Sequence, residues 1–91
     1  MVSIQEATKR AMGFVLEVLG PERTSGVRLE EVESASVDGE DAWVITLSIP
    51  DEEPGAFASA FGGRSRQYKS LTVLKRDGEV KSMKIRNLAG A

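Results

Sequence analysis

Apolar residues recur at helical spacing near the start of the chain. Ser3 and Glu6 have the spacing of a capping box, in which the serine oxygen accepts from the glutamate amide and the carboxylate reaches back. Gly20 and Pro21 are typical of a helix end. The pattern therefore predicts an amphipathic helix over 4–19, with a stripe narrow enough to lie on a sheet. The stripe consists of Ile4, Ala7, Ala11, Phe14, Val15 and Val18, broadened by Met12 and Leu19.

The period then changes to two residues, which predicts strands. Residues 27–37 read as a first strand, bulged because the apolar positions after Leu29 are offset. Residues 38–41 predict a turn, and 43–49 form the clearest strand, which Pro50 ends. Its two predicted faces are Trp43, Ile45, Leu47 and Ile49 against Val44, Thr46 and Ser48.

Two further strands are predicted over 68–75 and 79–87. A three-residue loop over 76–78, with Gly78 left-handed, matches apolar side chains across this hairpin better than a two-residue loop. In this register Leu71 lies opposite Met83, with Val73 and Ile85 on the same face, and Leu74 meets Val80 on the other face. The expected fold is α+β, one domain over 1–91 with an N-terminal helix packed on a four-stranded antiparallel meander.

The connection over 51–67 is long for so small a domain, which usually indicates function or disorder. It begins acidic, continues apolar and ends in Gly-Gly-Arg-Ser-Arg. Phe57 and Phe61 are four residues apart, so a short helix would bring both rings to one side. They either fold back onto the core or stand exposed as anchors for a partner. The glycines and arginines could cradle an anion, although a simple hinge is the commoner use.

The composition excludes several kinds of catalytic and metal-binding site. The 91 residues include no cysteine and no histidine, which removes disulfides, thiolate nucleophiles, imidazole metal sites and the commonest general base. No acidic residue lies inside an apolar strand face that would desolvate it for acid–base catalysis. We expect no enzyme, no cofactor and no metal. No apolar run is long enough for a signal or spanning segment, so we expect the cytoplasm and no membrane contact.

Charge is strongly divided along the chain although the net charge is only −2. Residues 24–56 hold one basic and nine acidic side chains, whereas residues 57–91 hold eight basic and two acidic ones. Because a meander separates its first and last strands, neutralisation between the two halves is not assured. The alternatives are solvated faces with internal pairing, or two patches of which one docks a partner.

These features predict a small non-catalytic protein-association module that acts by self-association or by docking a partner protein, a homodimer included. The alternative is anion or nucleic-acid binding through the basic C-terminal hairpin, with Tyr68 available to stack. A low pI near 5.1 and the lack of a nucleic-acid motif argue against that alternative. The predicted partner-binding residues are Phe57, Phe61, Arg64, Arg66, Tyr68, Lys81, Lys84 and Arg86.

Several of these residues also resemble a known family. Ala7 and Ala11 in a leading helix, the strand Trp43-x-Ile45, and the segments Tyr68-x-x-x-Thr72-Val73 and Asp77-Gly78-Glu79-Val80 are similar to the PepSY-type small domain. Their order also resembles the C-terminal domain of O-type gas-vesicle accessory proteins. The resemblance implies a helix packed on an antiparallel sheet and a non-catalytic binding, inhibitory or assembly role.

Overall fold

A computed structural model of the chain describes residues 1–50 and 66–86. Its helix, α1, spans Ile4–Leu19, and the Ser3 side chain accepts a hydrogen bond from the Glu6 amide. The second half of the predicted capping box is not formed, because the Glu6 carboxylate pairs with Arg10 at 2.9 Å one turn later. Gly20 ends α1 with a φ of 89°, and its amide donates to the Leu16 carbonyl.

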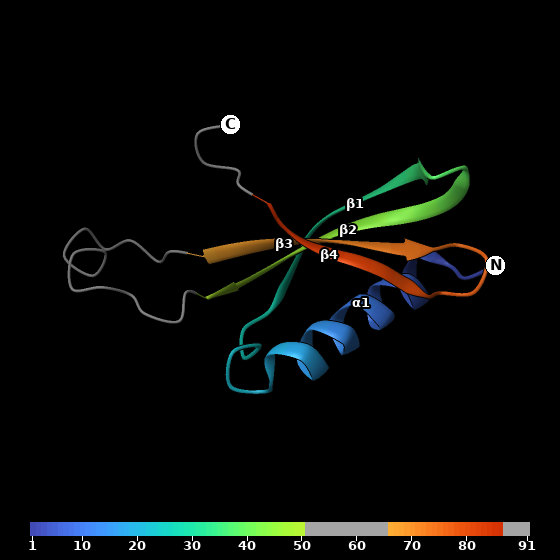
Figure 1. Ribbon diagram of the computed structural model, residues 1–91. Coiled ribbons are helices and arrows are strands. Elements are labelled where there is room, and N and C mark those ends of the chain that lie inside the picture. The colour runs from blue at the N-terminus through green and yellow to red at the C-terminus, as the bar shows by residue number, and fades with distance from the viewer. Residues whose placement is uncertain (51–65, 87–91) are drawn as a thin grey trace.

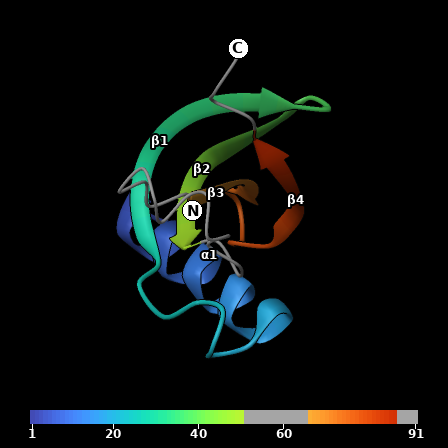
Figure 2. The same cartoon turned by 90° about the vertical axis from the view of Figure 1, so that its left-hand side faces the viewer.

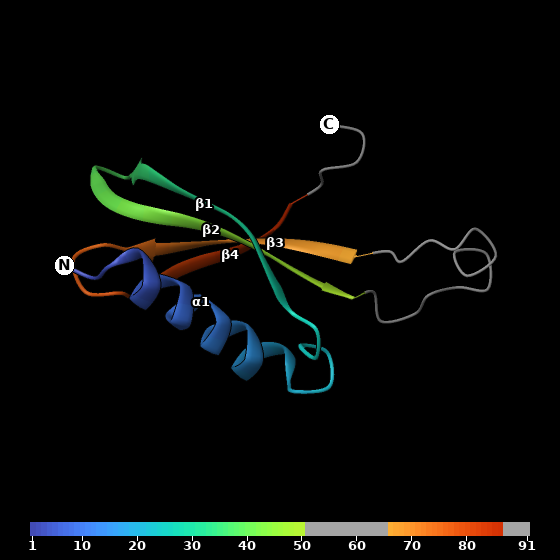
Figure 3. The same ribbon diagram turned by 180° about the vertical axis from the view of Figure 1, so that it is seen from behind.

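Four antiparallel strands form one sheet in the order β1-β2-β3-β4, so the predicted meander is confirmed. Their bounds are Arg28–Val37 for β1, Glu40–Pro50 for β2, Arg66–Leu74 for β3 and Val80–Arg86 for β4. Helix α1 lies across one side of the sheet, where it packs against β2, β3 and β4 (Figures 1 and 3). We call this side the helix-side face and the other side the polar face.

The first hairpin is tighter than the sequence predicted. Asp38 and Gly39 have φ values of 53° and 80° and make a two-residue turn, so β2 already begins at Glu40. The predicted bulge of the first strand is confirmed, since the pairing shifts between Leu29 and Glu31. This extra residue returns Val32 to the helix-side face opposite Ile45.

The second hairpin confirms part of the predicted register and corrects the rest. Leu71 pairs with Met83, and Gly78 has the predicted left-handed φ of 79°. The loop is one residue longer than predicted, because Leu74 rather than Lys75 bonds to Glu79. A shift between Thr72 and Val73 compensates and leaves Lys81 as the extra residue. Val80 therefore lies opposite Val73, and the predicted pair of Val80 with Leu74 is wrong.

The core lies between α1 and the helix-side face. Its buried members are Ala7, Ala11, Val15, Ile45, Leu47, Leu71 and Val73. Phe14 and Trp43 are only partly buried against this cluster, so Phe14, predicted for the apolar stripe, lies at the margin of the core. Ile4 and Val18, predicted for the buried stripe, are exposed. The small side chains of Ala7 and Ala11 face the sheet, which allows α1 to approach it closely.

The sheet is strongly curled. Seen along the strands, β1 and β4 curve toward each other on the side away from α1 (Figure 2). Arg86 on β4 consequently reaches across the polar face, with its Nη1 3.1 Å from Glu31 Oε1 on β1. The same Nη1 donates to Thr46 Oγ1 on β2 at 2.7 Å. The two edge strands, separated by two others in the order of the sheet, thus share one ion pair.

Candidate functional site

The outer edge of β1 is an open surface of the described structure. Helix α1 packs over β2, β3 and β4 and leaves the helix-side face of β1 largely uncovered (Figure 3). Most residues of β1 are exposed. Within residues 1–50 and 66–86, β1 pairs with β2 alone, so its far edge has no neighbouring strand. A ten-residue edge strand of this kind can accept another strand.

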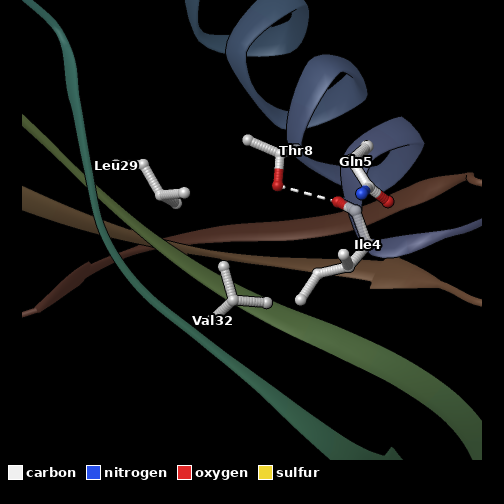
Figure 4. A pocket seen from close by; sticks show the side chains of 5 residues that line it. All are labelled: Ile4, Gln5, Thr8, Leu29 and Val32. Carbon is white, nitrogen blue, oxygen red and sulfur yellow. Dashed lines mark hydrogen bonds between the residues drawn. The ribbon is translucent and has the colours of Figure 1, made fainter.

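An apolar groove of about 310 Å³ runs between α1 and β1. Figure 4 shows its lining: Ile4, Gln5 and Thr8 come from the first turns of α1, and Leu29 and Val32 from β1. Ile4 is 39% exposed and Leu29 45% exposed, so both present apolar surface to an occupant. The Thr8 hydroxyl donates to the Ile4 carbonyl at 2.8 Å and requires no polar partner from that occupant.

The hydrogen-bonding pattern shows which backbone groups of β1 do not bond to β2. A two-residue turn closes on a hydrogen-bonded pair, here Val37 with Glu40. Bonded and non-bonded pairs alternate along an antiparallel ladder, so every second residue of β1 turns its amide and carbonyl away from β2. Those residues are Val32, Ser34 and Ser36. Their side chains lie on the helix-side face, and that of Val32 lines the groove.

The other side of the β1 edge is acidic. Glu31 and Glu33 pair with Thr46 and Val44 and therefore lie on the polar face. Glu31 has Arg86 as a partner, whereas Glu33 forms no ion pair within the described ranges, 1–50 and 66–86. An added strand would meet apolar side chains on one side and carboxylates on the other.

Near the beginning of β1, the buried hydroxyl of Ser48 holds two charged side chains, those of Glu30 and Arg66. Ser48 is fully buried on the polar face, donates to Glu30 and accepts from Arg66 Nε at 2.8 Å. A second nitrogen of Arg66 donates to the carbonyls of Gly26 and Ser48, at 2.6 and 3.0 Å. This cluster ties the beginning of β1 to β2 and β3. It holds the edge strand in place through hydrogen bonds that involve charged groups.

The predicted partner-binding residues fall into three groups. Phe57, Phe61 and Arg64 lie outside the described residues. Four others share the polar face, as the pairings show: Arg66, Tyr68, Lys84 and Arg86. Lys81 is separate from them, because it is the bulge residue of β4 and pairs with Asp38 and Glu40 at 3.2 and 3.9 Å.

Most of these cations already have partners inside the molecule. Arg66 is held by Ser48 and Gly26, Arg86 by Glu31 and Thr46, and Lys81 by the acidic first turn. Lys69 and Lys84 form no ion pair in the part of the chain that the structure describes. The division of charge along the sequence is therefore partly neutralised in space, by curling of the sheet and by contact between the two hairpins.

Sequence reasoning did not identify the groove. The pattern places Ile4 on the apolar stripe and Leu29 in the first strand, but it does not show which strands a helix will cover. The offset between Leu29 and Val32 was the available signal, since a bulge in a first strand bends an edge of the sheet.

Comparisons with protein-family models, with curated proteins and with solved structures find no match for this chain. No helix of the described residues is long and apolar enough to cross a membrane. The same residues contain no group of three acidic, histidine or cysteine side chains placed to hold a metal ion. The resemblance to PepSY-type and gas-vesicle accessory domains stays a prediction.

Proposed function

We propose that this protein is a non-catalytic association module that captures an extended protein segment as an additional strand on the outer edge of β1. The free amides and carbonyls of Val32, Ser34 and Ser36 supply the hydrogen bonds. The groove between α1 and β1 supplies apolar contacts. The observation that carries the proposal is the coincidence of a long unpaired edge with this apolar groove.

The two sides of the edge specify the chemistry of the segment. Side chains of an added strand alternate between faces, so every second one would lie beside Ile4, Leu29 and Val32. The intervening side chains would lie beside Glu31 and Glu33. The favoured segment therefore alternates apolar with basic residues, because apolar contact and opposite charge then act together.

Anion or nucleic-acid binding by the basic hairpin has less support. Lys81 and Arg86 face carboxylates of this chain, so an anion would have to replace those partners. Counterion release, the main source of such affinity, is small when few cations are available. Lys69 and Lys84 form no ion pair in the described structure, but Lys69 lies on the helix-side face and Lys84 on the polar face, so the two do not make one basic patch.

A panel of synthetic peptides of about ten residues tests the proposal. One peptide alternates valine with lysine, one alternates valine with glutamate, and one contains the valines and lysines in scrambled order. Fluorescence anisotropy at low salt should detect binding of the valine–lysine alternation. We expect affinity at least about tenfold lower for the other two, since charge or register is then wrong.

A proline at the edge provides the matched variant. Ser34→Pro removes one outward amide without removing a bond to β2, because proline is tolerated where a strand amide faces solvent. Ser34→Ala keeps that amide and removes only the side-chain bond to Lys75. Binding should be lost in the proline variant and kept in the alanine variant. Equal binding of all three peptides, or binding unaffected by Ser34→Pro, would contradict strand addition at β1.

A further inference from the structure

We infer that the segment captured by β1 is strand β4 of a second copy of this chain, so that copies join head to tail into a continuous sheet. The inference rests on the proposed function and names its partner. Strand β4 is the opposite edge of the same sheet. Its sequence over Met83–Arg86 alternates apolar and basic residues, which is the chemistry that the β1 edge favours.

The free groups of β4 match those of β1. Leu71 and Lys69 occupy alternate positions of β3 whose backbone bonds go to β2, so their β4 partners Met83 and Ile85 turn their amides and carbonyls outward. Both side chains lie on the helix-side face, as those of Val32 and Ser34 do. Ile85 is 80% exposed, and its large apolar side chain has no role within the described structure.

One antiparallel register satisfies backbone, apolar and charged groups together. With Ile85 opposite Val32 of the second copy, Met83 falls opposite Ser34, and all four residues are those with outward backbone groups. Lys84 then lies opposite Glu33, which brings together two charges that have no ion partner among the described residues of one copy. Arg86 falls opposite Glu31, so the pair made within one copy is made again between copies.

Like edges do not fit each other. Two β1 edges would bring Glu31 and Glu33 against their own copies, and two β4 edges would do the same with Lys84 and Arg86. The contact is therefore between unlike surfaces. It leaves one free β1 and one free β4 at the ends, so assembly grows unless a ring closes. An edge-to-edge contact buries little area, so association should be weak and salt-sensitive.

Blocking one edge at a time tests this inference. Ser34→Pro removes an outward amide of β1, and Ile85→Pro removes one of β4. Each variant alone retains one functional edge and should remain monomeric in sedimentation velocity at protein concentrations up to about 1 mM. That concentration is far above the dissociation constant of a tight dimer. An equal mixture should contain a heterodimer and nothing larger, because the remaining edges are blocked. Wild type should form larger species under the same conditions.

Charge reversal gives a second test that does not depend on proline. Glu33→Lys and Lys84→Glu change exposed residues that have no ion partner within the described structure, and circular dichroism checks that each variant is folded. Each alone should weaken association, and the chain carrying both substitutions should recover it, because the pair is restored with its signs exchanged. A dimer in either proline variant alone would indicate a symmetric contact and overturn the inference.

The two proposals fail differently. A wild-type chain that stays monomeric while it binds the valine–lysine peptide would overturn the second copy as the partner and leave strand capture in place. A chain that neither self-associates nor binds the peptide would overturn both.

Discussion

Ser48 shows at the scale of one residue how this small sheet holds charged groups. Its hydroxyl is fully buried, donates to Glu30 and accepts from Arg66. The sequence placed Ser48 on the polar side of its strand but did not predict its burial. Alternation assigns a side chain to a face, whereas burial depends on which neighbours fold over it. Here the bulge at Glu30 and the long side chain of Arg66 provide the cover.

Ser48→Ala should therefore lower the free energy of unfolding by about 1 to 3 kcal/mol, because two charged groups lose a hydrogen-bond partner. Urea denaturation measures this difference. Ser70→Ala is the matched control, since Ser70 lies on the same face opposite Thr46 and forms no side-chain hydrogen bond in the described structure. Equal effects of the two substitutions would mean that the Ser48 cluster does not stabilise the fold.

Gly39 and Gly78 allow the effect of backbone strain on stability to be distinguished from the effect of steric contact. Gly39 and Gly78 have nearly the same φ, 80° and 79°. A Cβ at Gly39 would meet nothing within 4 Å, whereas one at Gly78 would lie 3.1 Å from Arg10 Nε and 3.2 Å from Val2 Cγ1. Gly39→Ala should lower the free energy of unfolding by about 1 to 2 kcal/mol, because alanine is strained at a positive φ. Gly78→Ala should lower it by more, because the neighbouring side chains must also move.

Thermal unfolding of the two glycine variants gives the comparison. The difference between them reports how firmly the hairpin after β3 packs against the start of α1. Identical melting temperatures would mean that this packing contributes nothing beyond the left-handed backbone.

At the scale of elements, periodicity predicted the helix and all four strands, while the joints between them were less accurate. The long loop of the second hairpin and the bulge at Lys81 compensate each other, so Leu71 still meets Met83 although Val80 is displaced. The pattern of apolar residues predicts which side chains of β3 and β4 share a face, because those side chains are buried together. It does not reveal a longer loop and a bulge whose effects on the register cancel. The pattern is also insufficient for Ile4. A period of 3.6 residues places Ile4 on the apolar stripe, but its side chain lines the groove between α1 and β1.

The loop of the second hairpin carries a titratable group. The amide of Glu79 donates to Asp77 Oδ1 at 2.9 Å and lowers the pKa of the Asp77 carboxyl below its ordinary value, with help from the Arg76 guanidinium against a smaller effect of desolvation. The stabilisation by this carboxylate is complete above the ordinary pKa. It should disappear as the pH falls through the lowered value of the folded state.

Carbon NMR of the Asp77 carboxyl across an acid titration measures this shift directly. Asp77→Asn should be less stable than wild type near neutral pH, and the difference should vanish in acid. A pKa at or above the ordinary value for aspartate would show that the Glu79 amide does not hold the charged form.

At the scale of the whole molecule, the curl of the sheet decides what the charges can do. The sequence separates an acidic half from a basic half, and a flat meander would keep them apart. The curled sheet joins Arg86 to Glu31 and the second hairpin to the first turn. The charged sheet residues with neither an ion pair nor a side-chain hydrogen bond in the described structure are then Glu33, Asp41, Lys69 and Lys84. Composition alone does not predict this, because it depends on the twist of all four strands.

The position of α1 is also a property of the whole molecule. It covers three strands of four, so the fourth keeps an open edge and an apolar groove. The predicted association role is compatible with this surface. The partner-binding residues predicted from the sequence, however, belong to β3, to β4 and to the sequence before β3. Coverage of a sheet depends on helix length and crossing angle, which the pattern of apolar positions does not specify.

Amide hydrogen exchange by NMR, with and without the valine–lysine peptide, tests the account most directly. The amides of Val32, Ser34 and Ser36 point away from β2 and should exchange at least about tenfold more slowly once a strand is added. The amides of Glu31, Glu33 and Ala35 already bond to β2 and should change little. Protection of this alternate set is the predicted result. Binding of the peptide that leaves these three amides unprotected would contradict strand capture at β1.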